Sequence, residues 1–299
     1  MTTPSVGSER LEARLGRLRE LVEAALGRWL FPAGEELVPE LKAACEYVLF
    51  PGGKRLRPLV CLLVAEACRG RNDDALPAAA ALEYVHCYSL AHDDLPAMDD
   101  DDFRRGRPTC HKAHGEAMAI LAGDALLTRA FEVVALAAPR AVAADVAAEL
   151  ASAAGVAGMV GGQAADLLGE GTVPVEARVR WIHERKTAAL FKAAARIGAL
   201  CAGAPAPLVA AASSYGMELG LAFQVVDDLL GRNGDPRRTG KPVGKDDERR
   251  KLTYPAAIGE TSARARAAAL SESARRQAAT FPRPEELEAL ALQLKERVA

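Results

Sequence analysis

Residues 92–105, His-Asp-Asp-Leu-Pro-Ala-Met-Asp-Asp-Asp-Asp-Phe-Arg-Arg, hold six aspartates within ten residues and end on two arginines. The aspartates close an apolar run, residues 76–98, that has the composition of a core helix. Neighbouring carboxylates repel one another unless cations lie between them. Mg²⁺ prefers such oxygen ligands and is often shared with substrate phosphates, which arginine also binds well. The stretch therefore predicts a magnesium site for a diphosphate substrate.

The alternative interpretation is a solvated acidic loop, which is the usual meaning of a run of like charge. Three features of the sequence favour a site instead. The aspartates lie at the end of a predicted core helix, basic residues follow them at once, and a second pair, Asp227-Asp228, lies in another apolar segment. A solvated loop does not need this arrangement.

The composition favours helices. Half of the 299 residues are hydrophobic, only 5% are aromatic, and no alternating strand pattern persists. We therefore predict an all-α fold with a single domain over residues 9–299, preceded by a disordered N-terminus, residues 1–8. The net charge of −2 gives no general attraction to nucleic acid or to anionic membranes.

The apolar periodicity and the Gly and Pro breaks set the expected helices. They are predicted over residues 9–30, 36–49, 59–68, 76–92, 116–137, 142–159, 175–202 and 215–230, from about Tyr254 onward, and over 284–298.

The cysteines and the hydropathy pattern indicate a cytoplasmic protein. The six cysteines form no CxxC pair and have no zinc spacing, and most lie in apolar helical patterns, as buried thiols do. No stretch has the layout of a signal peptide, and no apolar run reaches about 18 residues without a charge. We expect no membrane insertion.

A basic segment, Gly52-Gly53-Lys54-Arg55-Leu56-Arg57-Pro58, precedes the helix predicted from residue 59. Glycine lets a backbone approach a ligand closely, and free N–H groups at a helix N-terminus favour anions. Lys54, Arg55 and Arg57 could together bind a second phosphate group. A solvated turn is the alternative interpretation.

Two further segments carry polar residues in apolar or loop surroundings. Lys186 and Thr187 interrupt one apolar helix and Gln224 another, although a Lys-Thr pair can also be an ordinary surface feature. Residues 232–251 form a highly charged Gly/Pro-rich loop that includes Lys241 and Lys251. A loop of this length is usually functional or mobile.

These motifs resemble the short-chain trans-isoprenyl diphosphate synthases, the family that makes farnesyl and geranylgeranyl diphosphate. The resemblance covers about residues 40 to 260, with the motifs in the family's order and spacing. The matching pieces are FPGGKRLRP (50–58), EYVHCYSLAHDDLPAMDDDDFRRGRPTCH (83–111), LAGDAL (121–126), GGQAADL (161–167), KTAALF (186–191), FQVVDDLL (223–230), GKPVGKD (240–246) and KLTYP (251–255).

The resemblance implies an isoprenoid-synthase-type helical bundle around a central cavity, acting as a homodimer. It also implies three Mg²⁺ ions in each active site. Asp93, Asp94 and Asp99 would hold Mg²⁺ at the diphosphate of an allylic substrate, and Asp227 would hold a third ion from an opposite helix. Arg104 would contact the same allylic diphosphate.

The remaining roles implied by the resemblance concern the two substrates and the reacting carbon. Isopentenyl diphosphate would be held by Lys54, Arg57, His86 and Arg105. The allylic diphosphate would be reached by Lys186, Lys241 and Lys251. The carbocation formed when diphosphate leaves would face the oxygen dipoles of the Thr187 hydroxyl, the Gln224 amide and the Lys186 carbonyl.

The sequence departs from the family in its second aspartate motif. The family pattern DDxxD reads here Asp227-Asp228-Leu229-Leu230-Gly231, so the last acid is missing. A non-catalytic partner subunit is one alternative, but such a subunit should also show damage in the first motif, which is intact. A terpene cyclase is another, but it would not need the basic segment 52–58.

Product length would depend on the residues one turn or so before Asp93, which are Tyr88 and Ser89. A side chain five residues upstream on the helix points toward the space that a growing chain enters. Tyr88 is bulky, so we predict that elongation stops at C15, farnesyl diphosphate. Geranylgeranyl diphosphate is the alternative product.

Overall fold

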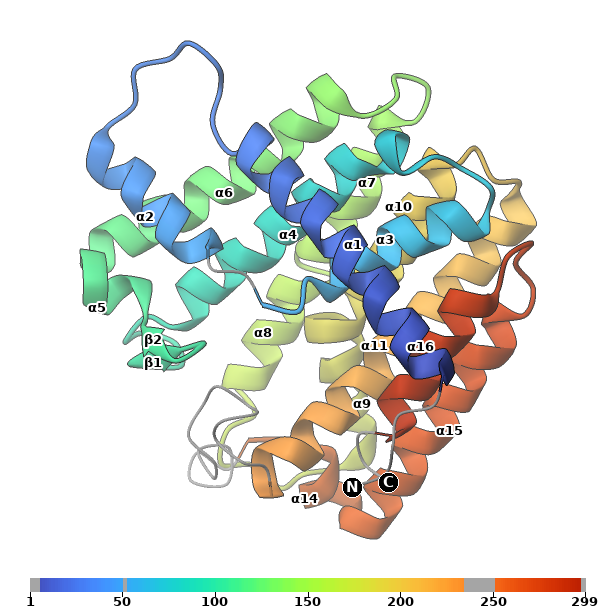
Figure 1. Ribbon diagram of the computed structural model, residues 1–299. Helices are drawn as coiled ribbons and strands as arrows, with labels where there is room; N and C mark the ends of the chain where they lie inside the picture. The colour runs from blue at the N-terminus through green and yellow to red at the C-terminus, as the bar shows by residue number, and fades with distance from the viewer. Residues whose placement is uncertain (1–5, 51–52, 234–250, 297–299) are drawn as a thin grey trace.

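The structure, a computed structural model, describes residues 6–50, 53–233 and 251–296 of the chain. It is a helical bundle with one short hairpin, which confirms the all-α prediction (Figure 1). The elements are α1 Val6–Trp29, α2 Pro39–Leu49, α3 Leu56–Ala67, α4 Asn72–Asp93, β1 Phe103–Arg104, β2 Arg107–Pro108, α5 Cys110–His114, α6 Glu116–Ala137, α7 Ala143–Ala154, α8 Met159–Leu167, α9 Glu176–His183, the π-helix η1 Glu184–Ala188, α10 Ala189–Cys201, α11 Ala206–Asn233, α14 Tyr254–Ile258, α15 Glu260–Ala278 and α16 Glu285–Glu296.

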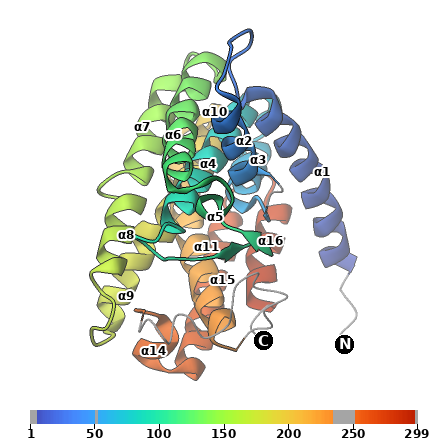
Figure 2. The ribbon, with the colours of Figure 1, turned by 90° about the vertical axis from the view of Figure 1, so that its left-hand side faces the viewer.

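Helices α4 and α10 lie at the centre of the bundle. Helix α4 packs against α3, α6 and α10, and α10 also contacts α3, α7 and α11. Figures 1 and 2 show both helices enclosed by their neighbours. Most residues of α4 are buried around its whole circumference, as expected for a helix with no solvent face. The largest hydrophobic cluster runs from Leu11 to Leu294, so the first and last described helices pack on the same core.

Small residues allow the central helices to approach one another closely. A Cβ at Gly198 of α10 would lie 2.2 Å from the carbonyl oxygen of Cys61 in α3. A Cβ at Gly220 of α11 would lie 2.7 Å from the Cα of Ala188. No larger side chain fits either contact, so these glycines set the spacing of the helices that carry the site.

Several predicted boundaries change in the structure. Helix α1 begins at Val6, so residues 6–8 are helical and not disordered as predicted, while residues 1–5 lie outside the described part. The small residues there do not prevent a first turn, because its N–H groups need no helical partner. The helix predicted over 142–159 is divided into α7 and α8 at Gly155–Gly158. Helix α5 and the hairpin β1–β2 were not predicted, because both are too short to show a periodicity.

One stretch, Ala143–Leu167, is long and apolar enough to cross a membrane by length and composition alone. It consists of two helices with a break between them, and one such stretch is weak evidence for a membrane span. The cysteines agree with the prediction of buried thiols. None of the six forms a disulfide, and all but Cys68 are buried.

Candidate active site

The aspartate-rich stretch folds back over the C-terminal end of α4. The backbone N–H of Asp99 donates to the carbonyl of Asp93 at 2.7 Å, and that of Asp101 donates to the carbonyl of Asp94 at 3.2 Å. These bonds satisfy carbonyls that a helix end leaves without partners. They also fix the directions of the consecutive acids, because Asp99 and Asp101 are buried whereas Asp100 and Asp102 are exposed.

Asp93 and Asp99 lie in one electrostatic cluster with two lysines. Burial and the charges of Asp99 and Asp94 raise the pKa of Asp93 to about 6, although Lys186 and Arg104 act in the opposite direction. The Lys251 ammonium donates to Asp99 at 3.0 Å. Crowded, partly buried carboxylate oxygens are the hard donors that Mg²⁺ prefers. The donor set at Asp93 and Asp99 therefore fits the predicted metal.

Asp94 has a different environment from Asp93. Its carboxylate is almost fully buried; its two oxygens share the Nε–H of Arg104, each at 2.8 Å, and Oδ1 also accepts from Nη2 at 2.5 Å. Asp101 lies 3.8 Å from the same guanidinium. Such a bidentate pair fixes the plane of the arginine. These contacts indicate that Asp94 positions Arg104, and its predicted role as a metal ligand stays a prediction.

Asp166 of α8 joins the two lysines of the cluster. The Lys186 ammonium donates to Asp166 at 2.6 Å, and that of Lys251 lies 3.7 Å from the same oxygen. No role for Asp166 follows from the sequence, although it belongs to the GGQAADL motif. A Cβ at Gly162 of that motif would lie 2.2 Å from the backbone nitrogen of Lys186. The motif therefore brings a carboxylate to Lys186 by close packing of α8.

Lys186 and Thr187 lie in a π-helical segment, η1, Glu184–Ala188. Such segments are frequent at functional sites because they displace the backbone from regular helical bonding. The Thr187 hydroxyl donates to the Gln224 amide oxygen at 2.6 Å. The structure thus brings together two of the oxygens that were predicted to face the carbocation. Burial excludes the alternative that Thr187 is an ordinary surface residue.

The two members of the second aspartate pair, like those of the first, lie in different environments. Asp228 is buried and accepts from the Gln224 amide at 2.9 Å and from the backbone N–H of Tyr254 at 2.9 Å. Asp227 is exposed, and its charge acts on Arg57. Asp228 therefore connects α11 to α14, and the predicted role of Asp227 as a metal ligand stays a prediction.

Within the basic segment, Arg55 faces the protein core. The sequence had predicted instead that it could bind a phosphate group. Its backbone is left-handed, with φ 50°, which turns the side chain into the core. The guanidinium donates to Glu23 at 2.8 Å, to Glu83 at 2.7 Å and to the Leu49 carbonyl at 2.7 Å. Arg55 therefore forms buried ion pairs with Glu23 and Glu83, and its role is structural.

Arg57, Arg105 and His86 converge near one another. Burial lowers the pKa of Arg57 to about 10, and its guanidinium lies 4.9 Å from the Phe191 ring centroid. Burial and the charges of Arg57, Arg105, Arg104 and Arg55 hold the pKa of His86 well below its usual value. The Arg105 guanidinium lies against Gly53, where a Cβ would approach it to 3.0 Å. The positive charge of these arginines around a neutral histidine is suited to binding a diphosphate group.

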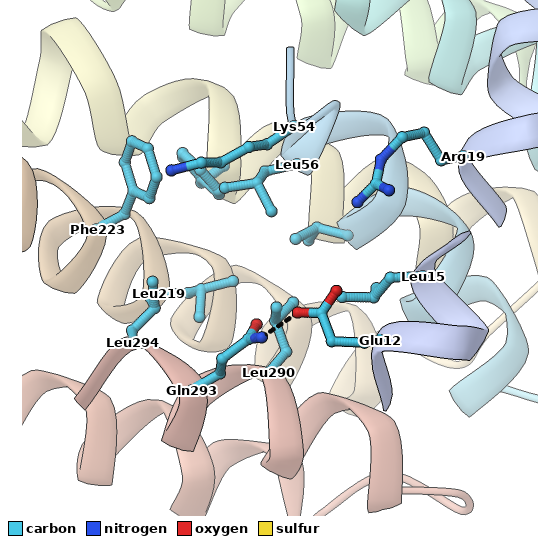
Figure 3. A pocket seen from close by; sticks show the side chains of 12 residues that line it. Glu12, Leu15, Arg19, Lys54, Leu56, Leu219, Phe223, Leu290, Gln293 and Leu294 are labelled. Atoms are coloured by element: carbon cyan, nitrogen blue, oxygen red, sulfur yellow. Dashed lines mark hydrogen bonds between the residues drawn. The ribbon is translucent and has the colours of Figure 1, made fainter. Parts of the chain in front are cut away.

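Lys54 lies at the rim of a cavity of about 230 Å³ beside this basic region. Figure 3 shows Lys54 extending toward Phe223, while Gln293 donates a hydrogen bond to Glu12 across the cavity. Helices α1, α3, α10, α11 and α16 contribute its lining. The lining residues are Glu12, Leu15, Arg19, Lys54, Leu56, Val60, Phe191, Leu219, Phe223, Leu290, Gln293 and Leu294.

Tyr88 and Ser89 lie within one or two turns of Asp93 on α4. The Tyr88 ring is buried and packs edge-on against His92, with centroids 5.8 Å apart. The Ser89 hydroxyl donates to the His86 carbonyl at 2.8 Å. Lys241 is part of residues 234–250, outside the described residues, so its predicted role stays a prediction. A separate group of possible metal ligands, Asp100, Asp102 and His111, lies beside the first motif.

Comparison with known proteins decides the family. The sequence model of the polyprenyl synthetases matches residues 38–287. The chain belongs to the polyprenyl synthetase family. It is 43% identical over 270 residues to a farnesyl diphosphate synthase of Geobacillus stearothermophilus, covering 89% of this chain and 90% of the relative. The resemblance stated from the motifs is thereby confirmed.

Two other comparisons concern product and fold. This polyprenyl synthetase is 46% identical over 247 residues to geranylgeranyl pyrophosphate synthase 12, chloroplastic, of Arabidopsis thaliana, covering 80% of the chain and 67% of the relative. A geranyltransferase of Helicobacter pylori, complexed with magnesium and isoprenyl diphosphate, superposes with a TM-score of 0.85 at 28% identity. That likeness covers 99% of this chain and 100% of the other. The protein is a prenyltransferase with the fold of the isoprenyl synthases.

Proposed function

We propose that this prenyltransferase condenses isopentenyl diphosphate head-to-tail with the allylic substrates dimethylallyl and geranyl diphosphate, giving farnesyl diphosphate. The observation that carries the proposal is the pair of adjacent anion sites. One contains Asp93 and Asp99 with Lys186 and Lys251, and the other contains Arg57 and Arg105 around His86. The charge of Arg104 acts on both His86 and Asp93, so the two sites are neighbours.

Asp93, Asp99 and Asp227 would hold Mg²⁺, with three ions proposed for each active site. The bound metal would neutralise negative charge that develops on the departing diphosphate. The Helicobacter pylori geranyltransferase, whose structure contains magnesium, supports this assignment. Asp94 would act through Arg104, whose guanidinium it orients. The proposed ligand set is therefore smaller than the one predicted from the sequence.

The chain's own residues would control the reaction in three ways. Arg104, Lys186 and Lys251 would bind the allylic diphosphate, with Lys241 as a further predicted contact. As the allylic C–O bond breaks, the oxygens of Thr187 and Gln224 would face the cationic carbon and stabilise its charge. The double bond of isopentenyl diphosphate would attack that carbon to form the new C–C bond, and the resulting cation would lose a C–H proton to the released diphosphate as a new C=C bond forms.

For product length we propose that Tyr88 limits the chain to C15. Its buried ring on α4, about one turn before Asp93, supports this role. Replacing Tyr88 with alanine removes the ring, so Tyr88→Ala should give products of C20 or longer. Product masses measure this effect directly. An unchanged C15 product would exclude Tyr88 as the limit, and Ser89→Phe would then test whether the neighbouring position controls length.

We also propose a cytoplasmic homodimer that neither inserts into membranes nor binds nucleic acid. Large apolar side chains are exposed on α6 and β1, namely Ile120, Leu121 and Phe103, and support a protein contact there. The alternative role as a non-catalytic partner subunit depends on Gly231, which leaves the second motif without its last acid. The intact cluster around Asp93 favours the catalytic role.

The deciding experiment is an incubation of the purified protein with Mg²⁺, isopentenyl diphosphate and each allylic primer in turn. Mass spectrometry of the products should show C15 from either primer. A C20 product would keep the reaction and overturn the role of Tyr88. Absence of condensation with every primer, in a folded sample, would overturn the enzymatic proposal and favour a partner subunit.

A further inference from the structure

A second group of metal-ligating side chains lies on the outer side of the aspartate loop. One carboxylate oxygen each from Asp100 and Asp102 and one ring nitrogen of His111 all lie within 4.8 Å of one another. Asp100 and Asp102 belong to the loop after α4, and His111 belongs to α5. The three side chains therefore join two elements that flank the hairpin β1–β2.

The four consecutive aspartates face two different environments. Asp99 and Asp101 are buried, and they contact Lys251 and Arg104 respectively. Asp100 and Asp102 are exposed and approach His111 instead. The group is thus separate from the carboxylates assigned to substrate magnesium. Acidic residues alone would not indicate a site, because exposed carboxylates are commonly solvated.

The environment of His111 is a second observation, independent of the carboxylates, that indicates a metal site. His111 is only 7% exposed, and its Nε2 has no hydrogen-bond partner among the described residues. The Thr109 hydroxyl donates its single proton to the Asp101 carbonyl at 2.7 Å, so at the His111 Nδ1, 3.1 Å away, it can only accept. Neutral His111 therefore carries its proton on Nδ1 and presents a bare lone pair at Nε2. This is the tautomer that binds metals through Nε2.

We propose that Asp100, Asp102 and His111 bind a first-row transition divalent cation such as Zn²⁺. Two carboxylates and one imidazole form a mixed oxygen and nitrogen donor set, which suits Zn²⁺ and its neighbours better than Mg²⁺. Three protein ligands leave at least one coordination position for water. Binding of this cation would not depend on the substrates of the proposed condensation.

The cation would fasten the loop that carries the diphosphate-binding arginines. The ligands bracket residues 103–108, which form the hairpin and include Arg104 and Arg105. At present Lys112 balances Asp102 through a contact of 2.7 Å, but the lysine is 45% exposed and can turn into solvent. Bound metal would replace this loose contact with a bridge between the loop and α5. The role is structural, at a distance from the reacting atoms.

Titration calorimetry with Zn²⁺ tests the proposal on reduced, metal-free protein in excess Mg²⁺, which occupies the oxygen-only sites. Wild type should bind one Zn²⁺ per chain. Asp100→Asn should weaken binding at least about tenfold, because loss even of an outer contact has effects of this size. Asparagine keeps the shape and tolerates the positive φ of position 100, so folding should be preserved. His111→Gln should show the same loss.

Two control variants separate this site from others. Asp73→Asn changes an exposed aspartate on α4 that pairs with Arg71, and it should bind Zn²⁺ as wild type does. Asp93→Asn should also retain binding. Zn²⁺ should raise the Tm of wild type, Asp73→Asn and Asp93→Asn but not that of Asp100→Asn or His111→Gln, since a ligand stabilises only the folded state that binds it. Absence of wild-type binding, equal binding by Asp100→Asn and His111→Gln, or loss only in Asp93→Asn would each overturn the proposal.

Discussion

Asp93-Asp94 and Asp227-Asp228 are two pairs of consecutive acids, and in each pair the two carboxylates have different surroundings. Asp94 is buried against Arg104, and Asp228 is buried against Gln224 and the Tyr254 backbone. Their neighbours have other surroundings, because Asp93 lies in the cluster with Asp99 and Lys186, and Asp227 is exposed. We propose that in each pair one carboxylate binds the ligand and the other holds a basic or polar partner in place.

The two pairs differ in how the chain continues after them. Helix α4 ends at Asp93, and the loop that follows returns Asp99 to the same cluster. Helix α11 continues through Asp227 to Asn233, and Gly231 stands where a further acid would share the helical face. The first region therefore brings several carboxylates together, while the proposed cation site of the second depends on Asp227. The first should accordingly dominate catalysis.

The largest expected effect follows removal of charge from Asp93. Asp93→Asn should lower kcat about 10²–10³-fold, the usual loss when one preorganised charge-stabilising group is removed. Steady-state rates with geranyl diphosphate and isopentenyl diphosphate measure it. Asp73→Asn, the same change on the exposed start of α4, should keep the wild-type rate. A loss below tenfold for Asp93→Asn would show that the first pair does not dominate.

Asp228→Ala should mainly change stability. The substitution leaves the Gln224 amide and the buried Tyr254 N–H without their acceptor, at a cost of about 2–4 kcal/mol in the free energy of unfolding. Asp227→Ala, at the neighbouring exposed position, should change it by less than about 1 kcal/mol. Urea unfolding monitored by circular dichroism compares the two. Equal losses would contradict the division of this pair.

The smallest effect should come from restoring the missing acid. Gly231→Asp places a carboxylate four residues after Asp227, on the same helical face. We expect kcat to rise, but by no more than about tenfold, which corresponds to ~1.4 kcal/mol. Gly231→Asn is the matched control, because it adds the same volume without the charge. Equal rates for Gly231→Asp and Gly231→Asn would show that the second motif needs no further acid.

The sequence predicts the helical architecture well where the apolar periodicity is long. Helix α6 has the predicted bounds, Glu116–Ala137, and the acidic and basic motifs are found on the predicted segments. The π-helical segment at Lys186 was not predicted, because no local sequence pattern distinguishes one turn of π-helix inside an apolar helix.

Side-chain roles were harder to predict than elements. Arg55 resembles Lys54 and Arg57 in sequence, yet its left-handed backbone directs it into an ion pair with Glu83. Local sequence gives no sign of this conformation in a residue other than glycine. The role of Asp166 depends on contacts with Lys186 and Lys251, far away in the chain. Such contacts come from packing of whole helices, which one sequence does not specify.

The most direct test of the division within the acid pairs is the Mg²⁺ dependence of the rate in Asp94→Asn. The structure assigns Asp94 to orienting Arg104, so the half-saturating Mg²⁺ concentration should stay at the wild-type value. The KM for geranyl diphosphate should rise instead, by about tenfold, as a positioned arginine loses its bidentate partner. If the Mg²⁺ requirement rose as much as in Asp93→Asn, with KM unchanged, Asp94 would be a metal ligand and the proposed division of this acid pair would be wrong.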